Sequence, residues 1–274
     1  MRINFKNIIT AAIILVFSVS CSNGESKKTQ IKEASTIVEN EQIVKNPNSE
    51  VLEITKVNHA TFNSLLNKYV NNKGLVNYAG LSKEKSTLQN YLVGLAKVDA
   101  SKLTKNEATA YWINAYNAAT LDQIIRNYPA TSILKIAGGK VFDNPLPYKF
   151  NGESLSLNDI EKKKLLGGNL FDARVHFAVN CAAVSCPTLL NKAYTEENVQ
   201  SLLTANTKAA LTNPAFNKIS TSNASISKLF DWYKTDFVKA EGSVINFINK
   251  YSSIKLSANA KIDYLEYNWD LNGK

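Results

Sequence analysis

The chain has 274 residues, with 32 Lys and Arg against 23 Asp and Glu and a formal net charge of +9 at pH 7. The basic residues are scattered and form neither an Arg-rich stripe nor a nucleic-acid motif, so we expect no nucleic-acid partner. The chain also has no G-x-G-x-x-G, Walker, G-x-S-x-G or H-E-x-x-H motif. This argues against nucleotide-dependent, serine-hydrolase and zinc-protease chemistry, and no cofactor is predicted.

Residues 1–20 have the layout of a secretory signal peptide. Arg2 and Lys6 form a basic start, and the apolar run over residues 8–19 is too short for a membrane-spanning stop-transfer helix. Small residues then precede Cys21, which resembles a bacterial lipoprotein signal, in which this cysteine is acylated. The alternative is an ordinary signal peptide with a chance cysteine. We therefore expect a protein of the bacterial cell envelope, lipid-anchored on the exported side of the membrane.

Residues 21–50 are dominated by Ser, Lys, Glu, Asn and Gln and show no sustained apolar period. Such a segment cannot bury enough apolar surface to fold alone, so it predicts a flexible tether that follows the lipid. Residues 51–274 carry apolar and aromatic side chains throughout. Their length fits a single globular domain with a substantial core.

Three helices are predicted in the first half of this domain. Apolar residues recur at three- and four-residue spacing over residues 58–70 and 83–95, as in amphipathic helices. Thr104 and Glu107 form a capping-box pattern, which predicts a third helix that runs to Tyr128, just before a proline.

Two asparagines lie within the third helix. Asn114 and Asn117 are three residues apart and therefore share a face. Asparagine is unfavourable inside a helix because its amide competes with the backbone. The pair either hydrogen-bonds neighbouring backbone groups, or it orients a catalytic group or substrate.

The second half mixes helices and strands. Ser156 and Asp159 predict a cap for a short helix that ends at Gly167 and Gly168. Residues 174–180 alternate apolar and polar side chains, which predicts a half-buried strand. Further helices are expected over residues 196–211 and 225–238, and a closing strand over residues 261–269. The predicted fold class is α+β, a helix-rich single domain with a small antiparallel sheet.

The most informative stretch gathers one of the two histidines, His176, with two of the three cysteines, Cys181 and Cys186. On an uninterrupted strand Cys181 would point away from His176. The two side chains can meet only if the chain turns at Asn180 or Cys181, which the small residues and the proline that follow favour.

Four motifs occur in one order along the chain: YWINAYNA over residues 111–118, SLNDIE over 156–161, RVHFAVNC over 174–181 with SCP over 185–187, and LFDWY over 229–233. Together they resemble the family called domain of unknown function 547, over roughly residues 60–250. The resemblance implies no established reaction. It nominates Asn114, Asn117, Arg174, His176 and Cys181 as site residues without assigning roles to them.

Three interpretations of the cluster remain open. In the first, Cys181 is a nucleophile, His176 is its base and Arg174 steadies a carboxylate or oxyanion, with Asn114, Asn117 or Asp159 as the orienting group. The layout is distantly similar to papain-like and transglutaminase-like thiol enzymes, although their nucleophile opens the helix and this helix carries no cysteine.

In the second interpretation Cys181 and Cys186 form a disulfide, as an oxidising compartment allows, with a stabilisation of about 2 kcal/mol for so short a loop. In the third, His176 and the two cysteines bind zinc, with His59 as the only other histidine. The chain is then either a thiol-dependent hydrolase or acyltransferase, or a non-catalytic envelope lipoprotein that binds a peptide or small molecule.

Overall fold

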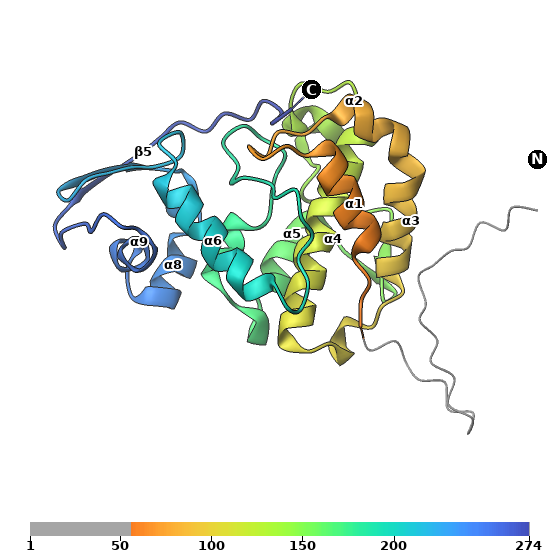
Figure 1. Ribbon diagram of the computed structural model, residues 1–274, viewed down its shortest axis with the longest axis horizontal. Helices are drawn as coiled ribbons and strands as arrows, with labels where there is room; N and C mark the ends of the chain where they lie inside the picture. Colours follow the sequence, from red (N-terminus) through yellow and green to blue (C-terminus); the bar gives the residue numbers. More distant parts are fainter. Residues whose placement is uncertain (1–55, 274) are drawn as a thin grey trace, which may run out of the picture. The chain divides into compact units, whose positions relative to one another are not determined.

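The structure is a computed structural model that describes residues 56–273 (Figure 1). The predicted signal peptide, the acylation site at Cys21 and the tether lie outside the described residues. Within residues 56–273, no helix is long and apolar enough to cross a membrane.

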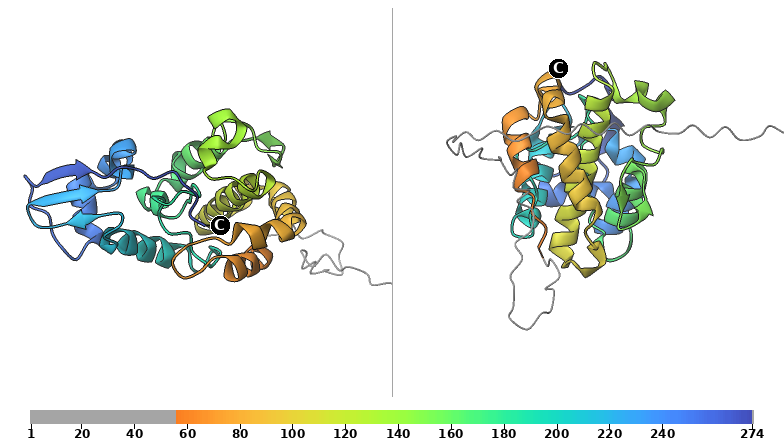
Figure 2. Two further views of the ribbon diagram at one scale, coloured as in Figure 1. Left: turned by 90° about the horizontal axis from the view of Figure 1, so that it is seen from above. Right: turned by 90° about the vertical axis from the view of Figure 1, so that its right-hand side faces the viewer.

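A layer of helices forms the first half. The helices α1 (Ala60–Tyr69), α3 (Lys85–Ala96) and α4 (Lys105–Arg126) match the three predicted ones, and the short α2 (Tyr78–Leu81) lies between the first two in sequence. In Figures 1 and 2 α4 runs beside α3, and nearly all of it from Glu107 onward is buried. Its many alanines allow neighbouring elements to approach closely. The helix α4 is therefore the centre of the first core.

The start of α4 differs in one detail from the predicted capping box. Thr104 Oγ1 accepts a hydrogen bond from the Glu107 N–H at 3.2 Å, as expected. The Glu107 carboxylate, however, accepts the N–H of Val57 at 2.8 Å. It therefore ties the segment before α1 to α4 and does not close the cap.

The middle of the chain is built from short elements: η3 (Ile133–Gly139), the antiparallel hairpin of β1 (Lys149–Phe150) and β2 (Glu153–Ser154), α5 (Leu157–Asp159), η4 (Ile160–Leu165) and η5 (Gly168–Leu170). The capping box of Ser156 and Asp159 is confirmed. After it, the Leu166 N–H donates to the Glu161 carbonyl at 2.9 Å. This i to i+5 bond makes η4 a π-helical turn, a rare element that occurs frequently at functional sites.

The strand predicted over residues 174–180 is wrong, because this stretch contains a short 3₁₀ helix, η6 (Ala173–Phe177). The Asp172 carboxylate caps it by accepting the Arg174 N–H at 2.9 Å. The apolar residues belong to two separate cores: Val175 and Val179 pack into the first, and Phe177 into the second. The alternation in sequence thus reflects burial against two cores and not the two faces of a sheet.

The second core lies in the C-terminal part. It is made of α6 (Val199–Thr212), α7 (Leu229–Trp232), α8 (Lys234–Glu241), α9 (Val244–Tyr251) and a three-stranded sheet of β3 (Lys218–Ile219), β4 (Asn223–Ile226) and β5 (Lys261–Tyr264). The strands β3 and β4 are antiparallel, whereas β4 and β5 are parallel. In Figures 1 and 2 α6 lies between the α1–α4 helices and this sheet with α8 and α9.

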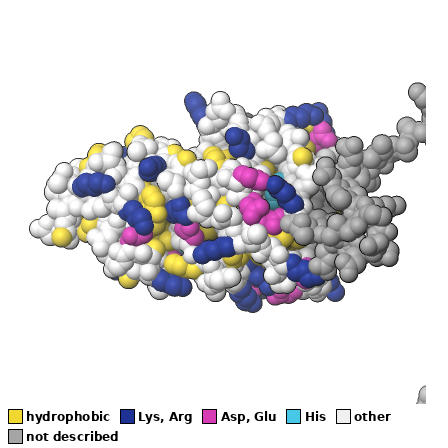
Figure 3. Space-filling view, turned by 60° about the horizontal axis from the view of Figure 1, so that its bottom comes forward, with side chains coloured by type: hydrophobic (Ala, Val, Ile, Leu, Met, Phe, Trp, Pro, Cys, Tyr) yellow, Lys and Arg dark blue, Asp and Glu magenta, His cyan; other side chains and the backbone are white. Residues whose placement is uncertain are grey.

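The α+β class with a small antiparallel sheet is confirmed, with two further local corrections in the second half. The helix predicted over residues 225–238 begins only at Leu229, because the preceding residues form β4, and it breaks at Tyr233. The closing strand ends at Tyr264 and not at residue 269. On the face shown in Figure 3, Lys and Arg side chains are interspersed with Asp and Glu and form no continuous basic patch.

Candidate functional site

Cys181 and Cys186 are joined by a disulfide, with their Cα atoms 6.0 Å apart. The side chain of Asn180 shapes the loop that they close. Its Oδ1 accepts the N–H of Ala182 at 2.9 Å, and its Nδ2 donates to the Pro187 carbonyl at 2.8 Å. Ala182 has a φ of +60°, so the backbone turns here, one residue beyond the turn predicted at Asn180 or Cys181.

The two asparagines of α4 hold the backbone on either side of this loop. Asn117 donates to the Ala178 carbonyl at 3.0 Å and accepts the Asn180 N–H at 2.8 Å. Asn114 likewise donates to the Tyr194 carbonyl at 2.7 Å and accepts the Tyr194 N–H at 3.0 Å. Both side chains are buried. Both asparagines therefore satisfy the hydrogen-bonding groups of neighbouring backbone, which is the first of the two roles considered for them.

His176 lies between two carboxylates. Its Nε2 is 2.9 Å from Oδ2 of Asp236 on α8, and its Nδ1 is 3.6 Å from Oε1 of Glu161 on η4. The second distance is an ion-pair contact that is too long for a hydrogen bond. The ring also stacks on Tyr233, with the centroids 3.9 Å apart.

The carboxylates decide the protonation of His176. Burial lowers the pKa of its imidazole, but the hydrogen bond and charge of Asp236 and the proximity of Glu161 together raise the pKa above the ordinary value of 6.5. The raised pKa favours the protonated imidazole, and each ring nitrogen faces a carboxylate.

His176, Glu161 and the disulfide line one cavity of about 250 Å³. Six of the fifteen lining residues are Phe, Tyr or Trp, and they come from elements far apart in sequence. They include Tyr116 on α4, Trp232 on α7 and Trp269 near the C-terminal end. The full lining is Tyr116, Phe142, Asp143, Asn158, Glu161, His176, Val179, Cys181, Cys186, Pro187, Leu229, Trp232, Tyr233, Tyr267 and Trp269.

Glu161 acts electrostatically on three tyrosines of this lining. The pKa of each of Tyr116, Tyr233 and Tyr267 is raised above 10, first by burial and next by the negative charge of Glu161. The three phenols are therefore neutral. The cavity combines a buried carboxylate with uncharged aromatic rings.

The disulfide forms part of the cavity wall. The hydroxyl of Tyr267 lies 3.2 Å from Cys181 Sγ and 3.3 Å from Cys186 Sγ. Residues 268–272 bind the loop by backbone hydrogen bonds, such as Val184 N–H to the Asp270 carbonyl at 2.8 Å. The segment that follows β5 therefore both fixes the disulfide and supplies two of the aromatic walls.

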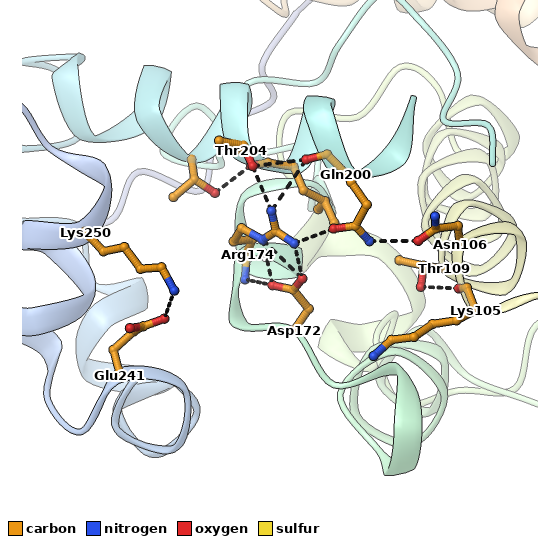
Figure 4. A network of polar contacts seen from close by, with 11 residues as sticks. Lys105, Asn106, Thr109, Asp172, Arg174, Gln200, Thr204, Glu241 and Lys250 are labelled. Carbon is orange, nitrogen blue, oxygen red and sulfur yellow. Dashed lines mark hydrogen bonds and ion pairs between the residues drawn. The ribbon is translucent and has the colours of Figure 1, made fainter. Parts of the chain in front are cut away.

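Arg174 does not share the cavity with His176, although both were expected on one polar face. Figure 4 shows its guanidinium in a network with Asp172, Gln200 and Thr204. Its Nη2 is 2.5 Å from Asp172 Oδ2, and the side chain lines a separate, open hollow of about 620 Å³. In a helical turn, residues two apart no longer point the same way, which separates the two side chains.

The zinc interpretation finds no matching geometry in residues 56–273. No group of three or more His, Cys, Asp and Glu side chains there could hold a metal ion. His59, the spare histidine, is buried against Tyr91, with Nδ1 2.7 Å from its hydroxyl, and does not line the cavity.

Several site residues were missed from the sequence. Glu161 and Asp236 flank His176, and Trp232, Tyr267 and Trp269 form walls, but none of the five had been singled out as a site residue. Glu161 and Trp232 each offered one signal, because they sit inside the SLNDIE and LFDWY motifs. Asp236, Tyr267 and Trp269 come from segments whose approach to His176 no local spacing indicates.

Residues 100–209 match the family model described as "Protein of unknown function, DUF547". This match supports the resemblance stated from the motifs over that part of the chain, and it carries no reaction. No curated protein matches the chain, and no solved structure matches it. The distant likeness to papain and transglutaminases is therefore unsupported.

Proposed function

We propose that the chain is an exported, lipid-anchored envelope protein that binds a small ligand in the aromatic cavity around His176. The observation that carries this proposal is the combination of a cavity of about 250 Å³, a lining with six Phe, Tyr or Trp rings and a few convergent polar groups. This is the usual composition of small-molecule sites, although the volume lies just below the common range of about 300–1,000 Å³. The ligand, or the part of it that enters, is accordingly small.

Two features favour binding over thiol catalysis. Cys181 is bonded to Cys186, and a sulfur in a disulfide is not a nucleophile. Both nitrogens of His176 face carboxylates, and its raised pKa favours the protonated ring, which cannot accept a proton from a thiol.

A second candidate is a thiol-dependent hydrolase or acyltransferase that forms when an external thiol reduces the disulfide. It is favoured by one observation: both sulfurs line the same cavity as His176. The sulfur of Cys181 would then bond to an acyl carbon, the bond to the leaving group would break, and the leaving group would depart with the thiol proton. Water or a second acceptor would release the acyl group.

Intrinsic fluorescence tests the binding function on the full chain in a nonionic detergent. Trp232 and Trp269 line the cavity, whereas Trp112 is buried elsewhere in the first core. A panel of small cationic, neutral and anionic organic probes should contain members that change the emission saturably. Trp112→Phe should retain this response and Trp232→Phe should reduce it. A panel in which no member of any charge binds would contradict the proposal.

The same protein preparation tests the second candidate, thiol-dependent catalysis. Acyl-ester hydrolysis that appears only after mild reduction, and that Cys181→Ser removes while Cys186→Ser retains it, would favour thiol catalysis. We expect instead that reduction produces no hydrolysis above that of the Cys181→Ser variant.

The anchor has its own test. The proposed acylation of Cys21 predicts a mature chain that begins at a lipid-modified Cys21, and intact mass spectrometry measures this directly. Cys21→Ser should abolish the added lipid mass. An unmodified N-terminus at another residue would contradict lipid anchoring and leave the binding proposal untouched.

A further inference from the structure

We propose that the cavity around His176 accepts the ammonium group of a small organic cation, either a primary or a quaternary amine. This inference rests on the proposed binding function and names the class of ligand. Three independent features of the cavity carry it: its charge, its aromatic walls and its size and opening.

The charge of the lining is opposite to that of the chain. The protein has 32 Lys and Arg and a net charge of +9, yet none of the described residues that line the cavity is Lys or Arg. The acidic members are Glu161 and Asp143. The one basic side chain of the described lining, His176, pairs with Asp236, which is not part of the lining, as well as with Glu161, so even a protonated ring does not cancel the charges of the cavity carboxylates.

Glu161 is the group that would meet the ligand. Its side chain is only 6 % exposed and lies 3.6 Å from the histidine. His176 Nδ1 is buried without a hydrogen-bond partner among the described residues. A carboxylate with so little water around it interacts strongly with a cation that enters, because the screening of bulk water is reduced. A bound ammonium group would supply a direct partner for this carboxylate.

The aromatic walls suit the same ligand. Trp232, Tyr267 and Trp269 pack against one another, with ring centroids 4.6–5.9 Å apart. Tyr233 and Tyr116 complete the lining near Glu161. Aromatic faces attract cations through the ring quadrupole, and cages of several aromatic rings are a known way to bind quaternary ammonium groups. An anionic ligand would meet repulsion from both features.

Size and access agree with a small ligand. The cavity holds about 250 Å³, and Trp232, at its wall, is 46 % exposed. The partly exposed indole therefore lies where the cavity meets solvent. An ammonium group with a short substituent can enter there, with its polar end near the exposed Asp143.

Titration calorimetry of the full chain in nonionic detergent provides the test, with choline as the cation. The control ligand is its neutral isostere, in which carbon replaces the nitrogen. We expect a Kd for choline about tenfold below that of the isostere. Glu161→Gln should remove most of this preference and leave the isostere unchanged. Asp263→Asn, which neutralises an exposed carboxylate on β5, should leave both affinities unchanged.

A thermal melt shows whether Glu161→Gln still folds. If it does not, a second variant provides the test. Trp232→Leu keeps an apolar side chain at the opening, and it should weaken choline several-fold more than the isostere. Glycerophosphocholine in place of choline tests whether the ammonium group belongs to a lipid head group or to a free small molecule. Tighter binding than choline would indicate a lipid head group, and weaker binding would indicate a free solute. Equal or tighter binding of the isostere by the wild type would overturn the cation proposal but retain ligand binding. Failure of every probe would overturn both.

Discussion

The most direct test of how the site is held together is Asn117→Leu. Asn117 satisfies two buried backbone groups, the Ala178 carbonyl and the Asn180 N–H. Leucine has a similar size but can bond neither group. Each buried group left without a partner costs about 1–3 kcal/mol, so the free energy of unfolding should fall by roughly 2–6 kcal/mol. For a domain of this size that corresponds to a loss of roughly 5–20 °C in Tm.

Urea and thermal denaturation followed by circular dichroism measure this loss. Asn67→Leu is the matched control, because Asn67 is also on a helix but is exposed, with one bond from its amide to the Asn63 carbonyl. Water can replace that bond, so its effect should stay within about 0.5 kcal/mol. Equal losses for the two variants, or a wild-type melt for Asn117→Leu, would refute the view that Asn117 holds the segment that carries the disulfide.

Three further outcomes are expected. The pKa of His176 is raised by its carboxylates despite burial, so its stabilisation is complete below the unfolded-state value of about 6.5 and is lost as pH rises through the folded value. In urea titrations at a series of pH values, the free energy of unfolding of the wild type should therefore exceed that of His176→Gln by the largest amount at low pH. A difference that does not change with pH would contradict this. Reduction of the Cys181–Cys186 disulfide should lower the free energy of unfolding by about 2 kcal/mol, as measured by urea denaturation with and without reductant. Arg174→Lys loses the forked contact with Asp172 and should cost about 1–2 kcal/mol, while ligand affinity in the His176 cavity stays unchanged; a marked loss of affinity would return Arg174 to the site.

The sequence predicts the helices well because their signals are local. The apolar period of residues 58–70, the Thr104 cap and the capping box at Ser156 each report on neighbours within one or two turns. The same kind of signal misled at residues 174–180. There apolar residues recur at every second position because Val175 and Phe177 pack into different cores. The sequence pattern cannot distinguish this from packing of one strand face against a single core.

The residues of the candidate site also fall into two groups, those that the sequence indicates and those that it does not. His176, Cys181 and Cys186 are close in sequence, and their scarcity made them visible. Asp236 contacts His176 from 60 residues away, and Tyr267 contacts Cys181 from 86 residues away. Their contributions depend on the packing of α8 and of the C-terminal segment, which no spacing in the sequence encodes.

The cavity is assembled from two stretches of chain that evolution could change separately. Its polar base, with Glu161, His176 and the disulfide, falls within the matched residues 100–209. Much of its aromatic wall, including Trp232 and Trp269, lies beyond that match. Proteins that share the matched stretch but differ after it would keep the base and present another wall. Divergence in ligand preference among them should therefore follow differences in the residues after 209, and a comparison confined to the matched stretch would overlook it.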